Sequence, residues 1–426
     1  MSRRVLPRRQ FLAAASGLAV LPAWAQFRVE IAGIGMRQIP LAVASFRDEL
    51  SSGVPVSEVV RADLLRSGLF RLIEAPDAMD ERSQPVLADW RARGADALVA
   101  GSVSRLADGR LDVRHKLWDA VKGEELIGRS QTVLPADLRL AAHRGADEIH
   151  ENLTGERGVF STRITYVVQQ GPRYSLVVSD ADGENAQVAL NSPDPIISPA
   201  WSPDGKSLAY VSFESRKAVV WVQDTQTGQR RMLANFRGSN SAPAWAPDGN
   251  SLALALSRDG LTQIYSIPAA GGEPQRLTSS RAIDTEPVYT ADGQQIYFVS
   301  DRGGGPQIYR MPAAGGRAER VSFDGDYNIS PSVSPDGRSL AYISRVSGGA
   351  FKLMTLEVAS GTVRTLTSTR DDESPSFAPN GRLIVYSTRA DGRDVLMTTT
   401  LDGRIKTRLL TSGADVREPA WGPFGR

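Results

Sequence analysis

Acidic side chains recur ahead of predicted strands in the second half of this 426-residue chain. Carboxylates gathered around one opening of a ring can bind a hard cation such as Ca²⁺ or attract the basic groups of another molecule. A rim of solvated charges that holds no ligand is the alternative, and the sequence favours it. The acidic residues in question are Asp194, Asp284, Glu286, Asp326, Asp371, Asp372, Glu373, Asp415 and Glu418.

Other residues that commonly carry catalysis or bind metals are scarce. The chain has no cysteine, which removes thiol catalysis and cysteine-ligated metals, and it has three histidines, His115, His143 and His150. His143 and His150 are seven residues apart and would share one face of a helix, but no third zinc ligand is obvious beside them. There is also no Gly-x-Ser-x-Gly nucleophile elbow. We therefore predict a protein that is not an enzyme, with no catalytic, cofactor-binding or metal-binding residues.

A short turn motif recurs at an unbroken spacing of 44 residues in the second half of the chain. In Trp201-Ser-Pro-Asp-Gly205 and its copies, proline fixes φ and the Asp-Gly pair supplies the positive-φ position of a tight turn. We interpret the repeated aspartates as turn residues rather than catalytic ones. The repeated position is occupied by Asp204, Asp248, Asp292, Asp336, Asn380 and Phe424.

The segments between these turns read as strands. Ser207–Ser212, then Val219–Val222, show the short apolar pattern that follows each turn, and four antiparallel strands every 40–50 residues are typical of a propeller blade. The first set, which begins at Ile164–Val168, lacks an inner strand, whereas Glu418–Gly422 is an inner strand without a set. We predict a mainly β fold, a six-bladed propeller closed by pairing the last strand with the first set.

Residues 26–155 do not repeat and read as a small α/β domain. Val56, Val59, Val60 and Leu64 share one helical face and Gly68 follows them as a stop. Strands are predicted at 97–103, 111–117 and 126–133, and a helix at 137–153. The order helix, strand, hairpin, strand and helix predicts a small α/β or α+β domain ahead of the propeller.

Residues 1–25 read as an export signal. Four arginines, an apolar stretch and Ala23-Trp24-Ala25 predict cleavage after Ala25, and either twin-arginine or general secretory export fits Arg8-Arg9-Gln10-Phe11-Leu12. The whole chain carries +2, and the signal holds four arginines and no acidic residue, so the mature chain carries −2. This charge gives no support for binding nucleic acid. We expect a periplasmic protein with no transmembrane segment.

Ordered variants of the repeat resemble one family. Residues 198–211, Thr285-Glu-Pro287, Asp372–Ser376 and Arg163–Val168 closely resemble TolB, the periplasmic component of the Tol-Pal system. The resemblance covers nearly all of the mature chain. The expected division is a signal peptide at 1–25, an N-terminal α/β domain with an arm at 26–155, and the propeller at 160–426.

The resemblance implies a non-enzymatic adaptor, expected to be monomeric. TolB-like proteins link the peptidoglycan-associated lipoprotein Pal to TolA, and support outer-membrane integrity and its invagination during cell division. Other outer-membrane proteins are further candidate partners. The alternative is an exported propeller enzyme, or a peptidase-accessory propeller, with a carboxylate site at the mouth of the ring.

The resemblance also implies partner-binding residues. Pal would dock on the propeller mouth, and TolA would bind the first mature residues. In place of the family's common His-Asn-Gly stretch this chain has Ser239-Asn240-Ser241. The implied Pal contacts are Ser239, Asn240, Ser241, Ala242, Thr285 and Glu286, and the implied TolA arm is Gln26, Phe27, Arg28, Val29, Glu30 and Ile31.

Overall fold

The structure is a computed structural model that describes residues 29–31, 38–409, 411 and 413–425. The predicted export signal and the first arm residues, Gln26, Phe27 and Arg28, lie outside the described residues. Among the helices that are described, none is both long enough and apolar enough to span a membrane.

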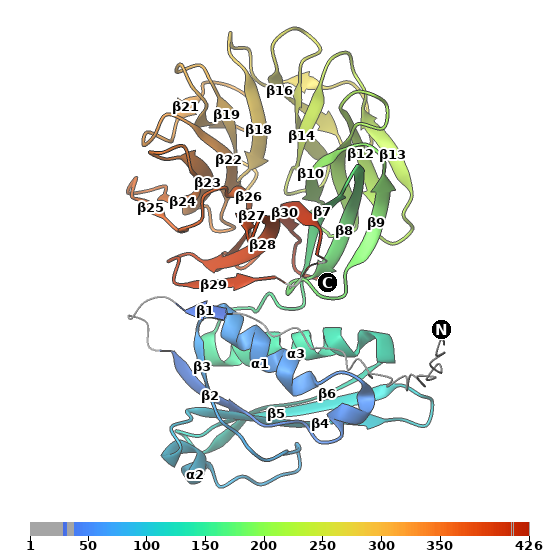
Figure 1. The fold of residues 1–426 in the computed structure, drawn as a ribbon, viewed down its shortest axis with the longest axis vertical. Helices are drawn as coiled ribbons and strands as arrows, with labels where there is room; N and C mark the ends of the chain where they lie inside the picture. Colours follow the sequence, from blue (N-terminus) through green and yellow to red (C-terminus); the bar gives the residue numbers. More distant parts are fainter. Residues whose placement is uncertain (1–28, 32–37, 410, 412, 426) are drawn as a thin grey trace, which may run out of the picture.

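The N-terminal domain is a five-stranded sheet with helices against it. The sheet has the order β3-β2-β4-β5-β6, with β2 parallel to β3 and β4, and the last three strands antiparallel. Helices α1 and α3 lie between this sheet and the propeller (Figure 1). The elements are β2 (Ile39–Val43), η1 (Glu49–Ser52), α1 (Val56–Ser67), β3 (Phe70–Ile73), α2 (Leu87–Ala92), β4 (Ala97–Arg105), β5 (Leu111–Asp119), β6 (Glu124–Val133), η2 (Pro135–Asp137) and α3 (Leu138–Thr154).

The predicted elements of this domain are confirmed. Helix α1 buries Val56, Val59, Val60 and Leu64, and it ends where Gly68 adopts a left-handed φ of 79°. The sequence analysis missed β2, β3 and α2. These are short elements. The parallel pairing of β2 joins strands that are distant in sequence, so no local turn motif indicates this pairing.

The rest of the chain forms six antiparallel sheets arranged as a ring, which confirms the predicted six-bladed propeller (Figure 1). We number the six sheets as blades 1 to 6 in their order around the ring. Blade 1 is the sheet that contains both the first and the last strand of the propeller. From the inner to the outer strand, blade 1 contains β30 (Asp415–Trp421), β7 (Arg163–Gln170), β8 (Arg173–Asp180) and β9 (Gln187–Ser192), and blade 2 contains β10 (Ile196–Trp201), β11 (Ser207–Ser212), β12 (Val219–Asp224) and β13 (Arg230–Ala234). In the same order, blade 3 contains β14 (Asn240–Trp245), β15 (Ser251–Leu256), β16 (Gln263–Pro268) and β17 (Gln275–Arg276), and blade 4 contains β18 (Asp284–Tyr289), β19 (Gln295–Ser300), β20 (Gln307–Pro312) and β21 (Glu319–Arg320). Blade 5 contains β22 (Asn328–Val333), β23 (Ser339–Arg345), β24 (Phe351–Glu357) and β25 (Val363–Thr365), and blade 6 contains β26 (Glu373–Phe377), β27 (Leu383–Ala390), β28 (Arg393–Thr400) and β29 (Ile405–Arg408).

The two ends of the propeller close the ring in the predicted way. The last strand, β30, pairs antiparallel with β7, and Trp421 lies opposite Ile164. The Trp421 indole donates a 2.8 Å hydrogen bond to the Thr162 hydroxyl, and both side chains are buried. Blade 1 therefore depends on residues that are separated by most of the chain.

Each blade buries one large side chain at the same position of its second strand. The spacing of 44 residues holds for these positions too, so every blade repeats the same packing unit against its neighbours. All six side chains are fully buried: Tyr166, Tyr210, Leu254, Phe298, Tyr342 and Tyr386.

The repeated Asp-Gly turns confirm the structural interpretation of their aspartates. Gly205 and Gly249 have φ values of 71° and 73°, and the carboxylates of Asp292 and Asp336 each accept a hydrogen bond from the backbone amide two residues later. We call the surface that these turns form the turn face. The opposite end of the ring, formed by the loops that precede the inner strands, is the mouth.

The N-terminal domain packs on the turn face of blades 6 and 1. Arg382, just after the turn of blade 6, forms two ion-pair contacts with Glu156 of the connecting segment. A Cβ atom on Gly68, at the end of α1, would lie 2.4 Å from a methyl carbon of Ile405 on β29. This arrangement leaves the mouth clear of the N-terminal domain (Figure 1).

Candidate functional site

The mouth is built from inner strands that all carry the same irregularity. In each strand the pairing with its neighbour shifts register, for example between Ser241 and Ala244 in β14. The residue in the bulge has a left-handed backbone although none of the six is glycine. With φ between 48° and 53°, these residues are Ser198, Ala242, Glu286, Ser330, Ser374 and Glu418.

This ring of bulges was missed by the sequence analysis, although a signal exists. Each of the six residues stands directly before a proline at the spacing of 44 residues. Proline disfavours the right-handed helical region for the residue that precedes it, and it cannot donate to the ladder. A left-handed non-glycine residue costs on the order of 1–3 kcal/mol, so the ring keeps six strained positions at its mouth.

Two of the bulge residues are glutamates on opposite sides of the ring. Glu418 belongs to blade 1 and Glu286 to blade 4, which are three blades apart in either direction. The Ser198 amide of blade 2 donates a 2.7 Å hydrogen bond to Glu418, and the Ser330 amide of blade 5 donates a 2.6 Å bond to Glu286. Each glutamate therefore ties its blade to the next one.

The enclosure of these two carboxyl groups changes their acidity. Burial, reinforced by the charges of Glu373 and Glu286, raises the pKa of Glu418 to about 7, although the Ser198 amide acts against this shift. Burial also raises the pKa of Glu286, against the hydrogen bond from Ser330. No arginine or lysine forms an ion pair with either glutamate within the described chain. Near neutral pH the mouth can gain or lose a proton here.

Two aspartates that the sequence placed in the rim lie inside the blades instead. Asp284 is fully buried, and Arg302 donates 2.8 Å and 2.9 Å hydrogen bonds to its two oxygens. Asp372 is also fully buried and accepts hydrogen bonds from Leu353 of blade 5 and Thr388 of blade 6. The expectation of a carboxylate ring that includes both residues is therefore corrected, because Asp284 is bonded within blade 4 and Asp372 connects blade 5 to blade 6.

The other acidic residues of the predicted rim lie at the mouth with varied surroundings. Asp326 is exposed and lies 3.3 Å from Arg345, and Asp415 accepts a 3.0 Å hydrogen bond from the Asp394 amide. Glu373 and Asp371 are exposed, and Asp194 is partly buried.

The residues implied for partner binding gather at the mouth of blades 3 and 4. Ser239 is exposed, whereas Ser241, Ala242 and Thr285 are partly buried. Asn240 is fully buried, and its amide donates to the carbonyls of Ala218, Phe236 and Gly238. Its side chain therefore shapes the loop and does not face outward.

The described part of the arm is a short strand, β1 (Val29–Ile31). It pairs antiparallel with β29 as a fifth strand of blade 6, with Val29 opposite Thr407 and Ile31 opposite Ile405. Three paired residues at the outer edge of a sheet supply few hydrogen bonds, each worth about 0.5–1.5 kcal/mol net. This ladder is shorter than that between β27 and β28 of the same blade.

The histidines are all buried in the N-terminal domain. His143 lies 2.6 Å from Asp63 and 3.7 Å from Asp182, so this pair of carboxylates surrounds it. Both carboxylates also pair with arginines, Asp63 with Arg66 and Asp182 with Arg139. His150 lies apart from this cluster.

His150 is instead a packed core residue. Its Nδ1 lies 2.8 Å from the Glu156 carbonyl, and its ring packs edge-on against Phe70 and Phe160. Burial lowers the pKa of His150. The structure therefore does not bring His143 and His150 together around one ion.

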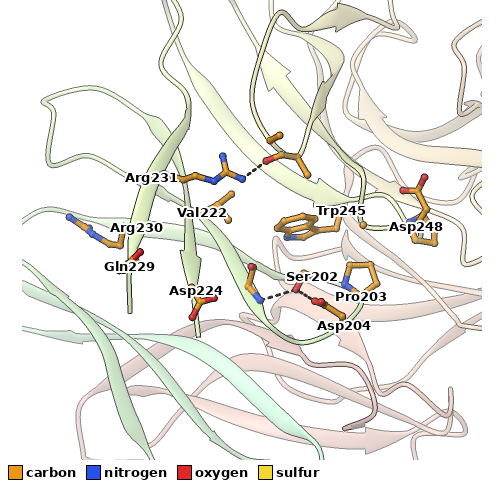
Figure 2. A pocket seen from close by; sticks show the side chains of 15 residues that line it. Ser202, Pro203, Asp204, Val222, Asp224, Gln229, Arg230, Arg231, Trp245 and Asp248 are labelled. Atoms are coloured by element: carbon orange, nitrogen blue, oxygen red, sulfur yellow. Dashed lines mark hydrogen bonds between the residues drawn. The ribbon is translucent and has the colours of Figure 1, made fainter. Parts of the chain in front are cut away.

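A cleft of 820 Å³ opens on the turn face between blades 2 and 3. Figure 2 shows Trp245 in its centre, with Val222 beside the ring and Arg231 and Asp204 on either side. The Trp245 indole donates to the Ala200 carbonyl of blade 2, and Arg231 donates to the Ala269 carbonyl of blade 3. The polar groups of this cleft thus form hydrogen bonds that connect blade 2 to blade 3.

Comparisons with known proteins agree with this geometry. The family described as the TolB beta propeller domain matches residues 150–425, and the TolB amino-terminal domain matches residues 27–126. The chain is 61% identical over 240 residues to the Tol-Pal system protein TolB of Albidiferax ferrireducens, a match that covers 56% of each chain. It is 53% identical over 229 residues to that of Bordetella parapertussis, covering 54% of this chain and 52% of the relative. The matched region thus spans about half the length of these curated relatives.

A solved structure is similar over a longer range. The crystal structure of TolB from Acinetobacter baumannii is 38% identical and superposes with a TM-score of 0.85. This match covers 94% of the present chain and 100% of that structure.

Proposed function

Because this chain belongs to the TolB family, we propose that it is a non-enzymatic periplasmic adaptor of the Tol-Pal system. The observation that carries the proposal is that the family match extends over the N-terminal domain and the whole ring. A docking platform and a detachable arm are thus combined in one molecule. In this role the protein is exported with cleavage after Ala25, and it supports outer-membrane integrity and invagination during division.

We propose that Pal docks on the mouth. Ser239, Ser241, Ala242, Thr285 and Glu286 supply the contact surface, while Asn240 holds the loop in place from inside the blade. Loops on a rigid ring can specify a partner without any catalytic group.

Exposed apolar side chains at the same end of the ring support this docking surface. Phe323 is 71% exposed, Leu261 is 53% exposed and Ile283 is 45% exposed. They belong to loops of blades 3 to 5 that border the mouth. Large apolar groups beside a polar rim are typical of protein interfaces.

We propose that the arm, residues 26–31, binds TolA. The weak pairing of β1 with β29 allows the arm to exchange between a docked and a free state. A shift of a few kcal/mol is enough to reverse the populations of two such states. Binding of Pal at the mouth would thereby expose the arm.

The alternative of a carboxylate enzyme is less well supported. An acid–base pair would have to be free to exchange protons with a substrate. Glu286 and Glu418 come closest, but each accepts a short hydrogen bond from the next blade. They are also where a Ca²⁺ ion would bind if one occupies the mouth, and the adaptor role requires none.

Purified Pal and TolA test the proposal. We expect the mature chain to bind both proteins, and a chain that begins at residue 32 to bind Pal but not TolA. Bound Pal should increase the protease sensitivity of residues 26–35. Loss of Pal binding together with hydrolysis of a peptide or sugar panel would favour the enzyme.

A further inference from the structure

A group of buried charges joins the two domains on the turn face. His143 lies on α3 with its Nδ1 2.6 Å from Asp63 of α1. Its Nε2 faces the propeller, 3.7 Å from Asp182 in the turn between β8 and β9 and 3.9 Å from Asp180 at the end of β8. The imidazole is fully buried, so one ring contacts carboxylates of both domains.

Two arginines complete this group, which we call the junction cluster. Arg66 of α1 donates a 2.6 Å hydrogen bond to Asp63, and Arg139 of α3 forms an ion pair with Asp182. Arg139 also lies 3.9 Å from Asp180. Arg66 is 2% exposed, so little water reaches this end of the cluster.

When its three aspartates are ionised, the charges of the junction cluster balance only if His143 is protonated. Burial raises the pKa of Asp180, so a proton on that carboxyl is the other way to balance them. Asp63, Asp180 and Asp182 carry three negative charges, and the two arginines carry two positive charges. A buried charge without a partner is costly, so an imidazolium is the form that neutralises the cluster. In agreement, the Nε2 atom of His143 and one oxygen of Asp180 are buried without a hydrogen-bond partner, and they face each other.

The other charged groups around His143 do not remove this imbalance. Asp147, one turn further along α3, accepts hydrogen bonds from the Phe160 and Ser161 amides of the connecting segment. Burial raises the pKa of Asp147 to about 6. Arg163 approaches Asp180 from β7 but is exposed, so water screens its charge.

We propose that His143 is a proton-controlled latch between the N-terminal domain and the propeller. With its proton, the ring attracts Asp63 on one side and Asp180 and Asp182 on the other. Without it, the junction keeps one uncompensated negative charge, and the turn between β8 and β9 separates more easily from α1 and α3. The latch does not depend on Pal or TolA.

The direction of the pH effect follows from the pKa of His143. Burial acts against the imidazolium, but the carboxylates of Asp63 and Asp182 outweigh it and raise the pKa above the ordinary value of 6.5. A raised pKa means that docking is fully strengthened below about pH 6.5 and loses this contribution as the pH rises through the raised value. Alkaline conditions should therefore loosen the junction.

A metal ion fits the same position less well. The ligand atoms of Asp63, His143 and Asp182 lie within 4.8 Å of one another. However, Asp63 is bonded to both Arg66 and His143, and Asp182 is paired with Arg139. A cation would have to displace these partners, whereas a proton on Nε2 displaces nothing.

Hydrogen exchange of the full mature chain tests the latch. After correction for the intrinsic pH dependence of exchange, we expect protection of residues 181–186 to fall at least tenfold between pH 6 and pH 8.5. His143→Gln should show low protection at both pH values. Asp180→Asn should show high protection at both, because the remaining charges balance with a neutral ring, and His115→Gln should behave like the wild type.

Imidazole NMR provides an independent readout, because the chain has only three histidines. We expect the His143 signals, assigned through His143→Gln, to titrate above those of His150. The proposal is overturned if the His143 ring is neutral at pH 6.5, or if the corrected protection of residues 181–186 does not change with pH. It is also overturned if added Zn²⁺ is required for protection and acts only in chains that retain His143.

Discussion

The mouth and the junction cluster both enclose carboxylates, but they compensate them differently. At the junction, Asp63 and Asp182 each pair with an arginine and lie beside His143. At the mouth, Glu286 and Glu418 accept hydrogen bonds from Ser330 and Ser198 of the next blade, and no cation of the described chain pairs with them. The junction balances its charges within the chain, whereas the mouth leaves two titratable carboxyl groups without a cation.

This difference separates a region that holds the molecule together from one that can receive another molecule. Removing one partner of a buried ion pair leaves an unpaired charge and is costly. An enclosed carboxylate without a cation, by contrast, gains from any positive group that a partner brings. The strained bulge residues lie at the mouth, and backbone strain of this kind is common at functional sites. The following variants would break or sharpen this comparison.

The largest effect should come from removing β30, the inner strand that closes blade 1. This strand carries Glu418 at the mouth and Trp421, which donates a hydrogen bond to Thr162. A chain that ends at residue 414 should lose more than the ~3–5 kcal/mol typical of truncating one buried aromatic residue, because blade 1 loses its inner strand. Thermal melting measured by circular dichroism checks this. A chain that ends at residue 424 is the control, and an unchanged melting temperature in the shorter chain would refute the closure.

Neutralising one carboxylate in each region should give opposite results. We expect Asp63→Asn to destabilise the fold by ~3–5 kcal/mol, since Arg66 and His143 lose their shared partner. Glu418→Gln should cost about 1 kcal/mol or less, because no buried cation is left behind. Urea denaturation at pH 7 measures both. Equal losses would show that the two regions are compensated in the same way.

The pH dependence of stability should distinguish the two regions. The pKa of Glu418 is raised from 4.5 to about 7, so the folded chain holds a proton that the unfolded chain releases. Stability should fall as the pH rises from about 4.5 to about 7, by at most ~1.4 kcal/mol per pH unit for one proton. Glu418→Gln should flatten this part of the curve and leave the loss above pH 7 that we assign to His143. If the Glu418→Gln curve parallels the wild type, the mouth carboxylate is not the titrating group.

The smallest effect should come from relieving one strained residue at the mouth. Ala242 has a φ of 49°, whereas Ala244 in the same strand lies outside the left-handed region. Ala242→Gly should stabilise the fold by about 0.5–1 kcal/mol, and the matched Ala244→Gly should destabilise it by a similar amount. Chemical denaturation of the pair measures the difference. Destabilisation by both substitutions would mean that the bulge stores no strain.

Repetition explains why so much of the propeller could be predicted. The turn at Asp204-Gly205 and its copies set the blade length, and the orphan strand at 418–422 predicted the closure that β30 and β7 form. Short-range turn chemistry and the period of 44 residues were enough for this, because each blade repeats one local unit.

The candidate site was predicted less completely, for two physical reasons. Asp284 and Asp372 were placed in the rim because loop position alone does not tell which way a side chain points, and both are buried. The junction cluster joins Asp63, His143 and Asp182, which only the packing of two domains brings together. No spacing in the sequence indicates the contact between these three residues.

The central claim is that the mouth, not the turn face, is the surface that binds another protein. Blade 3 offers a matched pair of exposed residues for testing it, Ser239 at the mouth and Asn250 just after the turn. Calorimetric titration with purified Pal should show at least a tenfold weaker affinity for Ser239→Arg and an unchanged affinity for Asn250→Arg. Unchanged binding by Ser239→Arg, with weakened binding by Asn250→Arg, would contradict the account.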